Sequence, residues 1–388
     1  MSSPDLTDAE RQAVYGVLNT PNLSMGPQIQ AFEKAFTDYT GLGHAIGVNS
    51  GTAGLHLCVR AAGIGPGDVV LTTPFSFVAS TNVLLFENAV PVFVDVDART
   101  GNLDPALLAE AASDLTAGGE RAQRWLSRKG SAARRAHKAV LGVDVFGQSA
   151  DWDPIRKIAD KFGLKVLEDS CEALGAEYKG RKAGTLGDFG VFAFYPNKQI
   201  TTGEGGIIVT EEAQAADLMR ALRNQGRAPG DTWLSHTYLG YNYRLDEMSA
   251  ALGVVQMRRL EELLGKREQV AAWYGERLVE IPGVEAPVVE NFNTRMSWFV
   301  YVVRFDRSID RDGLAKHLEA KGVPVRPYFL PIHLQPYMVE RFGYRTGDFP
   351  VTEDLGRRGL ALPFSGVMTE EQVDFVCRTI HAELGRSN

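Results

Sequence analysis

Cysteine is scarce in this chain of 388 residues, and the three that it has are far apart: Cys58, Cys171 and Cys377. Such spacing fits neither a disulfide framework nor a metal-binding cluster, so we expect a protein of a reducing compartment without a metal site. The first residues, MSSPD, have neither the basic nor the apolar region of a secretory signal. No apolar run approaches the ~20 residues of a membrane span. We therefore expect a cytoplasmic protein with no membrane partner.

An excess of positive charge is also missing. Lysine and arginine number 41 against 48 aspartates and glutamates, which gives a net charge of −7. Nucleic acid is therefore not expected as a partner. Hydrophobic residues make up 44% and charged residues 23%, as in ordinary soluble globular proteins, so a packed core is expected.

Short apolar runs alternate with helix-like stretches through the first half of the chain. The runs lie at residues 45–48, 69–71, 90–96, 139–145, 165–167, 191–194 and 207–209. Helical periodicity follows several of them, as in residues 155–162, which end at Gly163. Strands alternating with helices favour an α/β fold, with a mostly parallel sheet flanked by helices.

The pattern changes after Tyr243. Residues 246–278 form one long helical stretch, followed by a predicted strand at 298–305, a helix at 311–321, an extended segment at 323–329 and a final helix at 370–384. We predict a large domain over residues 1–255 and a smaller C-terminal α/β domain over residues 256–388.

A basic segment at residues 121–138 contains seven lysines and arginines and no acid. A solvated surface is the simpler interpretation. The alternative is a docking patch for a nucleotide diphosphate or an acidic partner.

Three short segments carry chemistry. Residues 49–55 (NSGTAGL) form a small-residue turn that opens a helix, which is typical of a phosphate site but also of an ordinary helix cap. Asp169 ends a predicted buried strand, where it can pair with a cationic ring nitrogen or cap the next helix. Lys198 lies in a tight turn behind another buried strand. Partial desolvation there would lower the pKa of its amine and make the neutral, nucleophilic form available, whereas the simpler alternative is a surface lysine in a loop. A phosphate turn, an acid and a Schiff-base lysine together are what pyridoxal 5′-phosphate (PLP) requires.

Longer motifs make the chain similar to one family. It resembles the DegT/DnrJ/EryC1/StrS family of sugar aminotransferases, within the fold-type I (aspartate aminotransferase-like) PLP enzymes. The resemblance runs over nearly the whole chain and is strongest in SGTAGL (50–55), EDSCEALG (168–175), GDFGVFAFYPNK (187–198), TGEGG (202–206) and GYNYR (240–244).

The resemblance implies a role for each matching residue. Lys198 would be the Schiff-base lysine and Asp169 the partner of the ring nitrogen. The other implied contacts are Ser50, Gly51 and Thr52 with the phosphate, Phe77 stacked on the ring, Glu172 beside the ring oxygen, Asn242 with the phosphate of the neighbouring subunit's cofactor, and Tyr328 and His333 on the substrate side. A homodimer with shared sites follows from the role of Asn242, although Asn242 stabilising its own turn and His333 as a packed core histidine are the simpler alternatives.

Two positions and one stretch depart from the family pattern, the stretch being the basic segment near residues 114–138, which resembles an insertion. Ala193 stands where many members have a serine that helps to hold the phosphate, and Glu172 stands where many have glutamine or histidine. The implied reaction moves an amino group from an amino acid, L-glutamate by resemblance, to a nucleotide-linked keto-sugar of the 4-keto-6-deoxy class. The alternatives are a sugar dehydrase of the same family, which carries histidine in place of the lysine, and a non-catalytic regulatory protein with the PLP fold. Lys198 argues against the first, and the intact set of site residues against the second.

Overall fold

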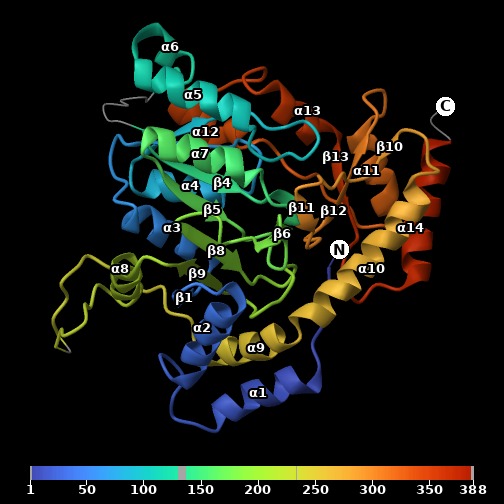
Figure 1. The fold of residues 1–388 in the computed structure, drawn as a ribbon. Helices are drawn as coiled ribbons and strands as arrows, with labels where there is room; N and C mark the ends of the chain where they lie inside the picture. Colours follow the sequence, from blue (N-terminus) through green and yellow to red (C-terminus); the bar gives the residue numbers. More distant parts are fainter. Residues whose placement is uncertain (1, 130–136, 233, 386–388) are drawn as a thin grey trace.

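The computed structural model describes residues 2–129, 137–232 and 234–385, and a seven-stranded sheet forms the centre of its larger part (Figure 1). In order across the sheet, the strands are β1 (His44–Val48), β9 (Gly206–Thr210), β8 (Phe189–Ala193), β5 (Lys165–Asp169), β4 (His137–Val143), β2 (Val69–Thr72) and β3 (Val90–Phe93). Strands β8, β5, β4, β2 and β3 pair in parallel, and β9 runs antiparallel to both of its neighbours. The expected mostly parallel α/β sheet is confirmed.

Helices cover both faces of this sheet because alternate residues of each strand point to opposite sides. Ile208 of β9 packs beneath α3 (Gly51–Ala61), α4 (Ala79–Phe86) and α8 (Ala213–Arg223). Its neighbours Ile207 and Val209 pack on the other face, against α2 (Pro27–Thr40), α9 (Glu247–Arg258) and α10 (Leu260–Leu278). Farther along that face, α5 (Pro105–Ala117) and α7 (Trp152–Phe162) cover β2 to β5. The sheet is thus buried on both sides, which accounts for its nearly continuous apolar strands.

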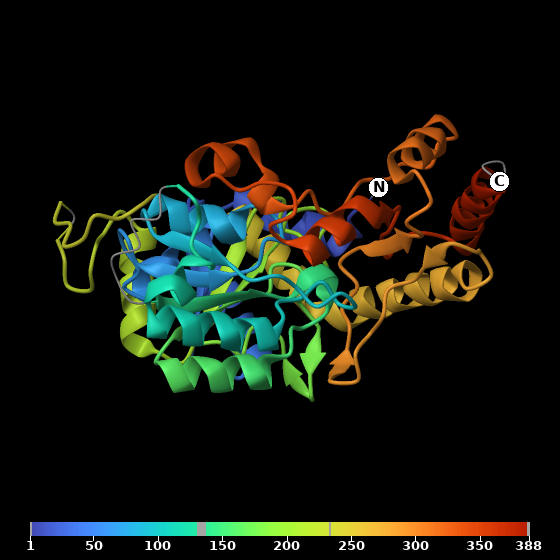
Figure 2. The same cartoon turned by 90° about the horizontal axis from the view of Figure 1, so that it is seen from above.

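A smaller antiparallel sheet lies beside the larger part, to the right in Figures 1 and 2. Its order is β10 (Val284–Glu285), β12 (Tyr301–Phe305) and β13 (Gly359–Leu362). It shares a hydrophobic core with α10, α11 (Arg311–Ala320) and α14 (Glu370–Leu384). The predicted domain boundary at 255/256 falls near the end of α9 and stays a prediction.

Arg259 interrupts the helical stretch that the sequence predicts as continuous over 246–278. The chain bends there, between α9 and α10, and the Arg259 guanidinium binds Asp5 at 2.9 Å and Glu10 at 2.6 Å. Neither proline nor glycine marks this bend in the sequence. The contacts that hold it come from Asp5 and Glu10, which are distant in sequence, so the local pattern could not indicate it. Continuous helix over 246–278 was therefore wrong at one point.

The remaining elements are short or peripheral. They are α1 (Asp8–Leu18), α6 (Gly119–Gln123), η1 (Val145–Gly147), η2 (Ile332–Leu334), α12 (Pro336–Phe342), α13 (Pro350–Arg358), and the strands β11 (Asn293–Arg295), β6 (Glu177–Tyr178) and β7 (Arg181–Lys182) of a third sheet. The segment between α8 and α9 projects away from the body in both views. Among the described helices, none is long and apolar enough to cross a membrane.

Candidate active site

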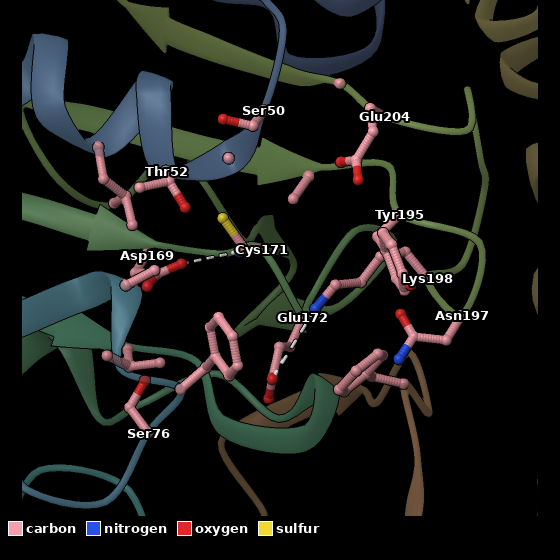
Figure 3. Close-up of a pocket in the computed structure, with 18 of the residues that line it drawn as sticks. Ser50, Thr52, Ser76, Asp169, Cys171, Glu172, Tyr195, Asn197, Lys198 and Glu204 are labelled. Atoms are coloured by element: carbon pink, nitrogen blue, oxygen red, sulfur yellow. Dashed lines mark hydrogen bonds and ion pairs between the residues drawn. The ribbon is translucent and has the colours of Figure 1, made fainter. Parts of the chain in front are cut away.

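A cavity of about 420 Å³ opens at the carboxyl ends of β4, β5 and β8 (Figure 3). This edge is where ligands bind in open α/β sheets, because the strand ends leave a crevice there. The structure brings most of the predicted site residues together around it: Ser50, Gly51, Thr52, Phe77, Asp169, Glu172, Lys198 and Tyr328. These residues come from five separate segments, so the sheet order, not closeness in sequence, assembles the cavity.

The N-terminus of α3 forms one wall. Ser50 caps the helix in extended conformation, and its hydroxyl accepts a hydrogen bond from the Ala53 N–H at 3.0 Å. A Cβ on Gly51 would lie 2.7 Å from the Ala193 Cβ and 2.9 Å from the Cys171 Sγ, so only glycine fits there. The first N–H groups of a helix have no carbonyl partner within it, and the helix dipole is positive at this end. This wall can therefore bind a phosphate.

Asp169 occupies the last position of β5, level with Val143 on β4 and Val191 on β8. The residue is only 6% exposed, and its Oδ1 accepts the Cys171 N–H at 3.1 Å. Burial raises the pKa of the Asp169 carboxyl, while the Cys171 hydrogen bonds and the charge of Lys198 lower it. A cation beside this carboxylate would favour its ionised form, and a protonated pyridine nitrogen is such a cation.

Lys198 reaches the cavity from the turn after β8. That turn is closed by a hydrogen bond from the Lys198 N–H to the Tyr195 carbonyl at 2.9 Å. The Lys198 Nζ lies 3.9 Å from the centroid of the Phe299 ring and 3.8 Å from the Glu172 Oε1. In Figure 3 its amine points toward Glu172, across the cavity from Asp169. A nucleophilic amine and the acid thus face the same space.

Glu172 turns its carboxylate toward Lys198 and the backbone of Phe146. Its Oε2 accepts the Phe146 N–H at 3.0 Å, which anchors one oxygen. Burial raises the pKa of Glu172, whereas the charge of Lys198 and the Phe146 hydrogen bond lower it. The Glu172 carboxylate is therefore placed to balance the charge of Lys198. The sequence placed Glu172 in the site only through the resemblance to the family.

Two predicted residues lie outside the cavity. His333 is completely buried, and its Nε2 is 2.9 Å from the Glu353 Oε1, in a cluster with Tyr344 and Phe349. Asn242 is exposed on the turn before α9, where its carbonyl accepts a bond of 3.4 Å from the Asn49 side chain. The structure thus does not bring either residue to this chain's own cavity.

Other lining residues were not singled out from the sequence. Tyr195 and Asn197 lie next to Lys198 in the motif 187–198, and this closeness in sequence could have indicated that they line the cavity. Phe299 and Glu204 also line the cavity. Phe299 arrives from the turn before β12, a hundred residues away, and nothing in the sequence connects it to the lysine.

The basic segment contacts acids of its own chain. Arg124 pairs with Glu110 and Asp114, Arg128 with Asp348 at 2.6 Å, and Lys138 with Asp68 at 3.1 Å. These pairs favour the simpler interpretation, a charged surface, for the part that is described. Arg134 and Arg135 lie outside the described residues.

A helix N-terminus able to bind phosphate, a buried acid and a largely buried amine around one cavity are the features expected of a fold-type I PLP enzyme. The residues present fit PLP, because the buried Asp169 carboxyl can pair with a cationic ring nitrogen and the N-terminus of α3 offers N–H groups to a phosphate.

The chain belongs to the DegT/DnrJ/EryC1/StrS aminotransferase family, whose sequence pattern matches residues 4–381. It is similar to the GDP-perosamine synthase of Caulobacter vibrioides, with 38% identity over 97% of this chain and 95% of the relative. The protein of the same name from Escherichia coli O157:H7 is 31% identical over 97% and 96%. The X-ray structure of DesV from S. venezuelae superposes with a TM-score of 0.85, at 32% identity over 96% of this chain and 94% of DesV. Since aminotransferases of this family depend on PLP, the chain is a PLP-dependent aminotransferase.

Proposed function

We propose that this aminotransferase transfers an amino group from L-glutamate to a GDP-linked 4-keto-6-deoxy sugar and releases the amino-sugar. The nucleotide-sugar class rests on the family and on relatives that act on such sugars. Guanosine diphosphate as the nucleotide rests on the two relatives named GDP-perosamine synthase. A cytoplasmic location remains part of the proposal. The single observation that carries the proposal is the amine of Lys198, which shares one cavity with the Asp169 carboxylate.

Each residue then has a defined task toward the cofactor. Ser50, Gly51 and Thr52 would hold the phosphate at the helix end, Phe77 would cover one face of the ring, and Asp169 would keep the ring nitrogen protonated. PLP, when bound, supplies the electron sink for a carbanion at the amino-bearing carbon. The Phe77 side chain is 62% exposed in the isolated chain, which leaves its face available for a flat ring.

Lys198 moves the proton. With the amino donor bound in the cavity, the Lys198 Nζ would act as the base that removes the proton from the donor Cα and as the acid that delivers it again later in the transfer. The position of Nζ between Glu172 and the Phe299 ring keeps it inside the cavity, and the Lys198 side chain is only 14% exposed. The keto-sugar then passes through the same steps in reverse order.

The alternatives predict different products. A dehydrase of this family would remove oxygen from the sugar without adding nitrogen, and a regulatory protein would yield no product. Incubating the enzyme with glutamate and a panel of GDP-, UDP- and dTDP-linked keto-sugars, with mass detection of the products, separates all three. Amination of a GDP-sugar supports the proposal. Amination confined to UDP- or dTDP-sugars would overturn the nucleotide assignment, and loss of oxygen without gain of nitrogen would overturn the reaction.

The projecting segment between α8 and α9 supports a homodimer in which Asn242 reaches the neighbouring site. Leu234 and Leu239, on this segment, are each 83% exposed, which is costly for an isolated chain and favourable at an interface. The diphosphate and carboxylate groups of the substrates also need cationic or N–H donors. Lys198 is the sole lysine or arginine among the described residues that line the cavity, so a second chain is a reasonable source.

A buried network holds the turn that carries Asn242. The hydroxyl of Tyr243 is 3.0 Å from the His56 Nδ1, and the His56 Nε2 is 2.8 Å from Glu87. Tyr241 donates to the same Glu87 oxygen at 3.1 Å, and the two tyrosine rings stack at 4.8 Å. Both neighbours of Asn242 are therefore fixed inward, and its own side chain is left facing outward.

A mixing experiment tests the shared site. Lys198→Ala and Asn242→Asp are each expected to be inactive as homodimers, the second because its added charge repels the phosphate. If Asn242 serves the partner, a mixed dimer has one site with both defects and one with neither, so activity recovers after refolding together. No recovery, with heterodimers demonstrated by differential tags, would mean that Asn242 serves its own chain.

A further inference from the structure

Arg267 is a buried arginine that contacts the backbone of the catalytic turn. It lies on α10, is 5% exposed, and has its guanidinium beneath the turn that carries Lys198. Its Nη2 donates to the Lys198 carbonyl at 2.6 Å and to the Asn197 carbonyl at 3.3 Å. Its Nη1 donates to the carbonyls of Trp298 at 3.1 Å and of Phe299 at 3.3 Å. One planar group thus holds four carbonyl oxygens from two distant segments.

This arrangement is unusual for a buried charge. A buried guanidinium ordinarily pairs with a carboxylate, because an unpaired charge is costly to desolvate. Within the described part of the chain, the hydrogen bonds of Arg267 go to neutral carbonyls. Burial lowers the pKa of Arg267 to about 10, so the group is still charged at neutral pH. Because burying the Arg267 guanidinium costs desolvation free energy, its presence beneath the lysine turn calls for a role beyond packing.

The two segments that Arg267 joins are the ones that define the position of the lysine amine. Lys198 contributes the Nζ, and Phe299 contributes the ring whose centroid lies 3.9 Å from it. Because the carbonyls of both residues bind the same rigid fork, the spacing between the lysine backbone and the ring is fixed. Lysine at position 267 could not reproduce this, since a single ammonium cannot reach both carbonyl pairs in one plane.

We propose that Arg267 is a positioning residue that holds Lys198 and Phe299 in register, so that the Lys198 amine meets the cofactor in the geometry for attack. The proposal rests on the proposed role of Lys198. Its consequence is specific: loss of the guanidinium should slow the covalent capture of PLP by Lys198 and leave the non-covalent binding of PLP unchanged. A purely structural role would weaken both together.

The chain offers a matched control. Arg304 on β12 also donates to two backbone carbonyls of a loop in the larger part, those of Ala98 at 2.6 Å and Arg99 at 2.7 Å. Burial lowers the pKa of its guanidinium as well. Neither Arg304 nor its two partners line the cavity. Arg304→Met therefore removes a comparable anchor without touching the lysine turn.

The experiment compares Arg267→Met, Arg267→Lys and Arg304→Met in protein freed of cofactor. Condensation of the Lys198 amine with the aldehyde of added PLP releases one water, and borohydride quenching at timed intervals reduces the new double bond for mass analysis. Misplacement of a reacting group by about 1 Å can cost roughly 100-fold, so we expect capture to slow by roughly 10- to 100-fold in both Arg267 variants. Arg304→Met should react at the wild-type rate.

Non-covalent binding is measured by PLP titration in the Lys198→Ala background, with and without Arg267→Met. Equal dissociation constants, together with slow capture, support the proposal. Capture at the wild-type rate in either folded Arg267 variant, a parallel loss of affinity, or equal slowing in Arg304→Met would overturn it. Labelling of wild-type protein at another lysine would instead refute the role of Lys198, so the two failures are distinguishable.

Discussion

Replacing Asp169 by asparagine removes a buried negative charge while keeping the shape of the side chain. The amide oxygen can still accept the Cys171 N–H, so the end of β5 should keep its structure. What the variant lacks is the charge that we propose holds the ring nitrogen of PLP in its protonated form. A hydrogen bond to a charged group contributes roughly 1.5–3 kcal/mol, and each 1.36 kcal/mol is tenfold in rate, so the glutamate half-reaction should slow about 10- to 150-fold.

The same substitution should stabilise the cofactor-free protein. Burial raises the pKa of Asp169 in the folded chain, so the folded state binds more protons than the unfolded state above the ordinary pKa of about 3.9. Stability contributed by this group therefore falls as the pH rises through that window. The Asp169→Asn variant does not ionise at this position, so it does not lose stability in this way. Its Tm should exceed the wild-type value at pH 7, and the difference should shrink as the pH approaches 4.

Two measurements check these expectations. Stopped-flow absorbance of the PLP-loaded enzyme after mixing with excess glutamate gives the single-turnover rate, and thermal unfolding of the cofactor-free protein from pH 4 to 8 gives the Tm. An unchanged single-turnover rate would remove Asp169 from the chemistry. A Tm at or below the wild-type value at pH 7 would show that the carboxylate does not carry the burial cost inferred for it.

Three further substitutions give distinct outcomes. Lys198→Ala should retain PLP without turnover, and borohydride should label the wild-type protein at Lys198 alone; a peptide map with the label elsewhere would contradict this. Gly51→Ala places a Cβ 2.7 Å from the Ala193 Cβ and 2.9 Å from the Cys171 Sγ, and overpacking of about 1–3 kcal/mol should weaken PLP binding roughly 5- to 150-fold, as read by titration. Glu172→Gln keeps a side-chain oxygen as acceptor and should retain most of its steady-state turnover; a severe loss would show that the carboxylate has a role of its own.

Local patterns were sufficient for much of the fold. The apolar run at 165–167 continues to Asp169 as β5, and the helix predicted at 155–162 ends at Gly163 in left-handed conformation. Asp169 and Lys198 were each placed after an apolar strand, and they share a cavity because β5 and β8 are parallel and end at the same edge of the sheet.

Features that depend on distant partners could not be predicted this way. The reversed direction of β9 is set by pairing with β1 and β8, and the bend at Arg259 by acids near the N-terminus. The predicted strand at 298–305 begins only at Tyr301, because Trp298 adopts a positive φ of 52° that turns Phe299 toward the lysine. No periodicity in the sequence signals such a turn, and the contribution of Phe299 to the site was missed for that reason.

A tilt of α10 about the bend at Arg259 would displace each residue in proportion to its distance from the bend. The helix has 19 residues and leads from the core of the larger part to that of the smaller sheet. At 1.5 Å per residue it is about 28 Å long, and Arg267 lies about 12 Å from the bend. A tilt of roughly 5° about Arg259 would move the far end by about 2.5 Å and Arg267 by about 1 Å. Displacements of the smaller sheet would thus reach the lysine turn at less than half their size, yet a tilt of roughly 5° would already move Arg267 by the ~1 Å that can cost roughly 100-fold in rate. The ion pairs of Arg259 with Asp5 and Glu10, which fix the bend, therefore also protect the geometry of the lysine turn.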